Sequence, residues 1–167
     1  MSTFAIAGVR RRYDHALVVL SNGTRQFPEY SNTWVYISMI HSWAGRHDEA
    51  LAAFANLQME ANPNTLVWKG TILARAGRTA EARAIAEQVD AAAKTRFLQP
   101  YFRAGLHAAL GDREVALTLL EQVVRDGEWF IAWIPHDPGL DVLRSEPRFA
   151  PLLQRALASR RSVTTSG

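Results

Sequence analysis

The stretch GRHDEALAAF, residues 45–54, decides the fold of this chain, because related stretches return at a regular interval. RRYDHALVVL precedes it at residues 11–20, and GRTAEARAIA and GDREVALTLL follow it at residues 77–86 and 111–120. One alanine keeps its place in all four stretches, at spacings of 34, 32 and 34 residues: Ala16, Ala50, Ala82 and Ala116. A period of this length is typical of a helix-turn-helix unit that stacks on copies of itself. The sequence therefore predicts an all-α repeat array.

Two further positions recur around this alanine. A glycine stands five residues before each of the last three alanines, as Gly45, Gly77 and Gly111. Glycine readily takes the left-handed backbone conformation that ends a helix, so each unit should turn there. Twelve residues before the same alanines stands a small residue: Ser38, Gly70 and Ala104. Short side chains let two helices approach closely, and each unit is predicted to be a tightly packed helix pair.

The apolar periodicity and the turn residues place the helices. The first helices of three full units are expected at 31–44, 64–76 and 98–110. Their partners are expected at 47–60, 79–92 and 112–126, and an earlier second helix at 13–26. Pro28 and Pro63 separate consecutive units, because proline stops one helix and favours the start of the next.

The residues at the repeat positions follow the spacing of a known family: Trp34, Ser38, Ala50 and Phe54 in one unit, Leu66, Gly70 and Ala82 in the next, and Ala104, Ala116 and Leu120 in the third. On these residues the chain resembles the tetratricopeptide repeat family. Lys69 and Arg103 depart from the pattern, since the family usually has an apolar residue there. The resemblance implies a right-handed α-solenoid of antiparallel helix pairs that binds proteins or peptides in a concave groove.

The segment WFIAWIPHDPGLDVLRSEPRFAPLLQRAL, residues 129–157, resembles a tail that follows the last repeat in many bacterial members. A terminal repeat exposes an apolar face, and the tail supplies side chains that could cover it. These are Trp129, Phe130, Trp133, Leu140, Leu143, Phe149, Leu152 and Leu153. We expect Ser145 to cap a helix that Pro147 opens, with Pro151 bending or restarting that helix.

The length fits a single domain over residues 1–159. It is expected to comprise a partial first unit (1–30), three full units (31–62, 63–96 and 97–126) and the tail (127–159), followed by a disordered segment (160–167). Phe4 occupies the slot of a small residue, so the array is expected to begin in the middle of a unit. That N-terminal edge should fray or pair with a second copy of the chain. Relatives with this tail often carry a winged-helix, serine/threonine kinase or cyclase domain, so the alternative function is a remnant or fragment of such a regulator.

Composition excludes several classes of site. The chain has no cysteine, which removes disulfides, thiolate zinc sites and a cysteine nucleophile. It has no segment with the apolar length of a membrane span and no recognisable leader, so a cytoplasmic bacterial protein is expected. No catalytic or nucleotide-binding motif is found, and no enzyme activity, cofactor or metal is expected.

His41 and His107 fall at equivalent repeat positions and are interpreted as packed between helices. The net charge of +3 comes from scattered arginines, which disfavours nucleic acid as a partner.

The clearest functional pattern is a stripe of large side chains. Tyr36, Trp68 and Phe102 each stand two places before the small packing residue, about 160° around the helix from it. Helical spacing adds Met39, Trp43 and Arg75. These six residues are the predicted partner-binding set, and the alternative is that neighbouring helices or the tail cover them.

The cations Arg75, Lys69 and Arg103 favour an acidic protein or peptide. The slots that clamp a chaperone's terminal carboxylate in the family hold Val35, Met39 and Trp68, which disfavours that ligand. Single-stranded RNA is a weaker alternative, because the basic residues do not follow the stripe.

Overall fold

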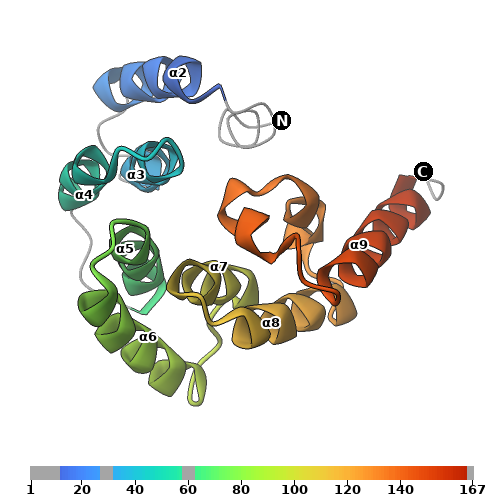
Figure 1. Cartoon of the computed structure of the whole chain (residues 1–167). Helices are drawn as coiled ribbons and strands as arrows, with labels where there is room; N and C mark the ends of the chain where they lie inside the picture. Colours follow the sequence, from blue (N-terminus) through green and yellow to red (C-terminus); the bar gives the residue numbers. More distant parts are fainter. Residues whose placement is uncertain (1–11, 27–31, 58–62, 165–167) are drawn as a thin grey trace. The chain divides into compact units, whose positions relative to one another are not determined.

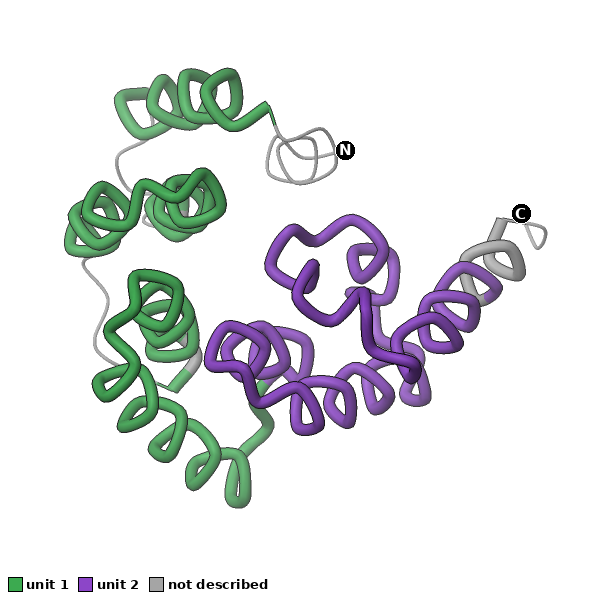
Figure 2. Tube along the Cα trace, in the orientation of Figure 1, with its two compact units in different colours: residues 1–98 green, residues 99–167 purple. Residues whose placement is uncertain are grey.

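A computed structural model describes residues 12–26, 32–57 and 63–164 (Figure 1). All of the regular structure in these ranges is helical, as predicted. The α-helices are α2 (Tyr13–Gln26), α3 (Asn32–Trp43), α4 (His47–Ala55), α5 (Pro63–Arg75), α6 (Thr79–Ala93), α7 (Pro100–Leu110), α8 (Arg113–Arg125) and α9 (Phe149–Thr164). Three short 3-10 helices lie between the last two: η1 (Trp129–Ala132), η2 (Ile134–His136) and η3 (Pro138–Leu143). The chain divides into two compact units, residues 1–98 and 99–167 (Figure 2).

The predicted helices of the repeats agree with the structure to within two residues at each end, with one exception. The helix expected at 47–60 ends at Ala55, because the backbone leaves the helix at Asn56 and Leu57. The side-chain amide of Asn56 donates to the carbonyl oxygen of Ala52 at 3.0 Å, which satisfies a group left open at the helix end. Residues 58–60, Phe4 and the expected start of the array lie outside the described residues.

The turns within the units share one backbone geometry. Gly45, Gly77 and Gly111 have φ angles of 77°, 77° and 83°, in the left-handed region that favours glycine. In the first of these turns the amide of Arg46 donates to the carbonyl of His41 and that of Gly45 to the carbonyl of Ser42. The other two turns repeat this pair of bonds, which is the Schellman motif. A fourth turn not foreseen from the sequence, at Gly127, has a φ of 70° and leads into the tail.

The first unit, residues 1–98, contains α2–α6. Within it α3 packs against α4, α5 packs against α6, and α3 also contacts α2 and α5. Ser38, Ala50 and Ala82 have no exposed surface, as the close approach of paired helices requires. The Ser38 hydroxyl donates to the carbonyls of Trp34 and Val35, at 2.8 and 2.9 Å, so its burial leaves no unsatisfied group.

The second unit, residues 99–167, consists of the pair α7 and α8 with the tail packed on it. One buried cluster joins both parts: Tyr101, Ala104, Ala108, Ala116, Leu117, Leu119, Leu120, Val123, Ile131, Ile134, Leu140, Leu143, Phe149, Leu152 and Ala156. Side chains of the tail therefore pack on the apolar side of the last helix pair. The expectation is wrong for Trp129, which is 71% exposed.

The end of the tail differs from the prediction in three ways. Its helix α9 begins at Phe149 and not at Pro147. Pro151 lies in the first turn, where a missing amide hydrogen costs nothing, so the helix continues through it. Helix α9 runs on to Thr164, into the segment for which disorder was expected.

Candidate functional site

The exposed face of α3 is defined by a single aromatic side chain. Among residues 33–43, Tyr36 alone is exposed, with 39% of its surface accessible. Its neighbours Val35 and Ile37 are 7% and 3% exposed, and Ile40, one turn later, is fully buried. The helix is thus apolar and packed on nearly every side, and a large ring stands on the side that remains open.

Helix α5 repeats this arrangement 32 residues later. Trp68 occupies the position equivalent to Tyr36 and is half-buried, and the next residue, Lys69, is exposed. The residues around it belong to the core, since Val67 and Ile72 are 3% and 0% exposed. Arg75 ends the helix and is half-buried. Because α3 and α5 contact each other within the first unit, equivalent positions of the two helices lie on adjacent elements. We call Tyr36, Trp68 and Lys69 the aromatic face.

The remaining members of the predicted set lie elsewhere. Met39 is 5% exposed and belongs to the core, while Trp43 is half-buried at the end of α3. Phe102 lies in the second unit, where its ring meets that of Phe130 edge-on, with centroids 4.8 Å apart. The tail therefore covers part of Phe102, which was the alternative that the sequence left open.

The two equivalent histidines have different surroundings. His107 is 5% exposed, and its Nδ1 lies 3.3 Å from the carboxylate of Asp112. In the first unit, the position equivalent to Asp112 holds Arg46, five residues after His41. Burial lowers the pKa of His41, and the charge of Arg46 lowers it further. The Nδ1 atom of His41 is buried without a hydrogen-bond partner, and Arg46 itself binds Asp14 of α2 at 2.7 Å.

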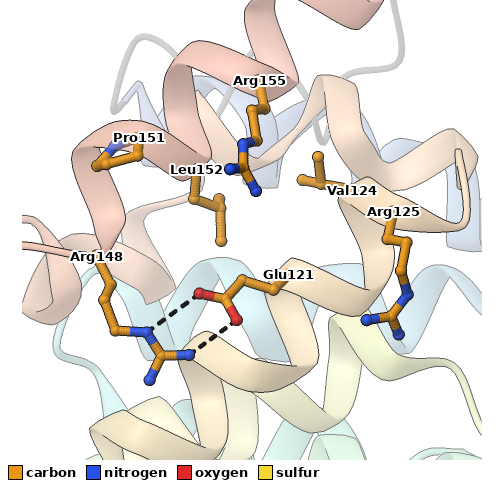
Figure 3. A pocket seen from close by; sticks show the side chains of 7 residues that line it. All are labelled: Glu121, Val124, Arg125, Arg148, Pro151, Leu152 and Arg155. Atoms are coloured by element: carbon orange, nitrogen blue, oxygen red, sulfur yellow. Dashed lines mark hydrogen bonds and ion pairs between the residues drawn. The ribbon is translucent and has the colours of Figure 1, made fainter.

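A hollow that the sequence analysis missed lies between α8 and α9 (Figure 3). Its volume is about 380 Å³. The residues that line it are Glu121, Val124, Arg125, Arg148, Pro151, Leu152 and Arg155. A sequence signal exists in part, because Leu152 and Arg155 are three residues apart, as neighbours on one helix face are, and Arg148 directly precedes that helix. The lining residues Glu121, Val124 and Arg125 come from α8. Spacing along a single helix cannot predict that residues of a second helix lie opposite.

Neither a membrane span nor a metal centre is found in the described ranges. No helix there is both long enough and apolar enough to cross a membrane. Among the same residues, no three histidine or acidic side chains gather as a set that could hold a metal ion.

The comparison with protein families gives a match in the first unit. Residues 63–88, which form α5, its glycine turn and most of α6, match the family model described as tetratricopeptide repeat. Neither the curated proteins nor the solved structures contain a match to the chain. The matched pair has the same turn geometry as the pairs before and after it, with the recurring alanine buried in each. Residues 63–88 thus match a tetratricopeptide repeat, and repeats of this family serve as scaffolds for protein–protein interaction.

Proposed function

We propose that the chain binds a protein or peptide segment along the aromatic face of its first unit. The observation that carries this proposal is the 39% exposure of Tyr36 on a helix whose other sides are packed. An aromatic ring held by a rigid, buried helix offers contact area with little loss of conformational freedom on binding. Trp68, at the equivalent position of the adjacent helix, supplies a second ring one repeat away.

Charge next to the rings favours an acidic segment. Lys69 directly follows Trp68 and keeps part of its surface accessible. Its charge also reaches Glu81, and it contributes to lowering the pKa of that carboxyl after the larger effect of Arg78. An acidic residue of a partner would compete for the same cation. We therefore expect selected ligands to combine apolar side chains with aspartate or glutamate.

A peptide library displayed on phage tests the proposal, because it offers the chain many candidate segments at once. Peptides selected on the parent chain would be synthesised, and their affinities for Tyr36→Ala and Trp68→Ala measured by fluorescence anisotropy. Truncation of an aromatic anchor costs roughly 2 kcal/mol or more, so the affinity should fall at least about thirtyfold. Lys69→Gln should weaken acidic peptides by about two- to fivefold, as expected for an accessible charge pair.

Phe97→Ala is the matched control, since Phe97 is 76% exposed in the same unit but lies on the connection after α6. It should leave the affinity unchanged. Circular dichroism would establish that each variant keeps its helices. Selected peptides that bind the folded Tyr36→Ala and Trp68→Ala variants as tightly as the parent would refute the aromatic face as the binding site.

A further inference from the structure

The turn between α3 and α4 gathers buried hydrogen-bond donors. The Nδ1 atom of His41 and the Nε and Nη2 atoms of Arg46 are buried, and none of the three has a hydrogen-bond partner among the described residues. Buried polar groups in folded proteins are nearly always paired, and each exception calls for an explanation. A guanidinium group is donor-only, and a neutral imidazole ring can carry its hydrogen on Nδ1. An acceptor placed in this turn would satisfy all three atoms.

The equivalent arginine of the next repeat shows what this side of a guanidinium group binds. Arg78 stands at the position equivalent to Arg46, and its Nε and Nη2 atoms donate to the two carboxylate oxygens of Glu81, both at 2.6 Å. Arg148 binds Glu121 through the same two nitrogens. Their spacing matches that of the two oxygens of a carboxylate. We call this side of the group, with Nε and Nη2, the carboxylate edge.

In Arg46 the carboxylate edge faces another environment. Glu49 follows Arg46 at the same spacing at which Glu81 follows Arg78. Glu49 is exposed, however, and Arg46 donates through Nη1 to Asp14 of α2 at 2.7 Å. The carboxylate edge is then buried, although 35% of the side chain as a whole is accessible. A small molecule needs only a small side-chain movement to reach this edge, whereas a polypeptide segment would need much more room.

His41 supplies a further donor. The charge of Arg46 lowers the pKa of His41, after the larger effect of burial, so the two side chains lie close together. In the second unit the equivalent histidine has a carboxylate beside it, since Nδ1 of His107 lies 3.3 Å from Asp112. Arg46 stands at the position of that aspartate. A carboxylate bound in the first unit would give His41 the contact that His107 makes within the chain.

We propose that the turn between α3 and α4 binds a small monocarboxylic acid, as its carboxylate, on the carboxylate edge of Arg46 and the Nδ1 atom of His41. The two oxygens accept from Nε and Nη2 of Arg46, and one of them also accepts from His41. A single negative charge fits best, because the charges of Asp14 and Glu49 also act on His41 and would repel a second one. Phosphate and dicarboxylates are therefore disfavoured.

This site is separate from the aromatic face. His41 follows Tyr36 by five residues, which places the two side chains about 140° apart around α3. Arg46 lies in the turn after that helix. Each proposal can therefore fail while the other stands, and Tyr36→Ala should leave carboxylate binding unchanged.

The probe is sodium acetate, added to the full chain at about pH 7 while sodium chloride keeps the ionic strength constant. Nitrogen-edited NMR should show a saturable shift of the Nε–H signal of Arg46, with a Kd of about 1–10 mM, which is within reach of a ligand of this size. Saturating acetate should also raise the pKa of His41, because a nearby anion favours the charged imidazolium form. The imidazole signals measure this pKa in a pH titration.

Arg46→Lys should weaken acetate binding about tenfold or more, because lysine keeps the charge next to Asp14 but has no carboxylate edge. Arg78→Lys is the matched control, since the carboxylate edge of Arg78 already holds Glu81. Its affinity for acetate should stay within about twofold of the parent, as expected for an exposed charge elsewhere. Circular dichroism would establish that each variant keeps its helices. Equal affinities of the parent and the folded Arg46→Lys chain would overturn the proposal, because charge alone would then account for the binding.

His41→Leu should weaken acetate binding about three- to tenfold through the loss of one donor. The next repeat has Leu73 at this position, so a helix pair of this kind accommodates leucine. Glu49→Gln should tighten binding by no more than about twofold, through the loss of a nearby negative charge. A gain of more than about tenfold would show that Glu49 occupies the carboxylate edge of Arg46 in solution, and would overturn the proposal.

Three further results would also contradict it. The absence of a saturable shift would mean that the turn binds no carboxylate. Tighter binding of inorganic phosphate or succinate than of acetate would reassign the turn to anions of higher charge. Equal binding of the tripeptide Gly-Glu-Gly with both ends blocked would reassign it to an acidic side chain of a protein partner.

Discussion

At the scale of single residues, the spacing between the two helices of a unit depends on Ala82 and its equivalents. Ala82 has no exposed surface, and α5 packs directly against the helix that carries it. The same helix offers a control, because Ala84 is exposed two residues later. Comparing the same substitution at Ala82 and at Ala84 separates the effect of side-chain volume in the interface from any effect on the helix itself.

Ala82→Leu should lower the free energy of unfolding by about 1–3 kcal/mol, because three added carbon atoms find no room between the helices. Ala84→Leu should change it by less than about 0.5 kcal/mol, as is usual for surface substitutions. Urea unfolding followed by circular dichroism measures both. Equal midpoints for the two variants would mean that the repeat register assigned to the first unit is wrong.

His41 gives the first unit a dependence on pH. Burial and the charge of Arg46 lower its pKa, against smaller opposite effects of Glu49 and Asp14. Below about pH 6.5 the unfolded chain takes up a proton on this residue more readily than the folded chain, so stability falls as the pH falls. Replacement by glutamine should remove part of that loss. Urea unfolding of the parent and of His41→Gln at about pH 7.5 and about pH 5.5 measures the difference, and identical losses in the two chains would exclude His41 as the cause.

At the scale of elements, a partly buried hydrogen bond ties the tail to the last helix pair. The hydroxyl of Tyr101 on α7 donates to a carboxylate oxygen of Asp137, and the other oxygen of Asp137 accepts from the amide of Gly139 at 2.6 Å. Asp137 thereby caps η3 and holds it against α7. Burial, with the charge of Asp137, raises the pKa of Tyr101 well above its usual value, so the hydroxyl stays protonated.

Tyr101→Phe should lower the free energy of unfolding by about 1–3 kcal/mol, since it leaves a partly buried carboxylate without its donor. The ring and its stacking on Phe130 remain, so the loss isolates the hydrogen bond. Hydrogen exchange should accelerate in residues 138–143 and stay unchanged in α5 and α6. Unchanged exchange of η3 in the variant would show that packing alone holds the tail.

The sequence predicts the repeats well because their period, turn glycines and small residues all depend on local chain geometry. It predicts side-chain exposure less well, because exposure depends on which element lies opposite. Tyr36 and Met39 shared one predicted stripe, yet they are about 60° apart around the helix, and Met39 is buried. The pairing of Arg148 with Glu121 joins residues 27 positions apart. Such a site depends on how the tail packs on α8. The spacing of residues along a single helix cannot predict that packing.

At the scale of the whole molecule, the chain consists of two compact units joined by a short exposed connection. The boundary follows Leu98, between α6 and α7. Lys94, Thr95, Arg96 and Phe97 lie outside the helices, and all four are exposed. Most other arginines of the described residues lie within helices, whose backbone does not fit a protease cleft without local unfolding.

Brief digestion with trypsin should therefore cut the interior of the chain first after Lys94 or Arg96, and release two fragments that each resist further cleavage. The variant Lys94→Gln/Arg96→Gln should survive several times longer under the same conditions, because the connection then offers trypsin no site. Mass spectrometry of the fragments identifies the first internal cut. An earlier cut after Arg113 or Arg125 would mean that α8 opens more readily than the connection, and that the second unit is not the compact body that its buried cluster indicates.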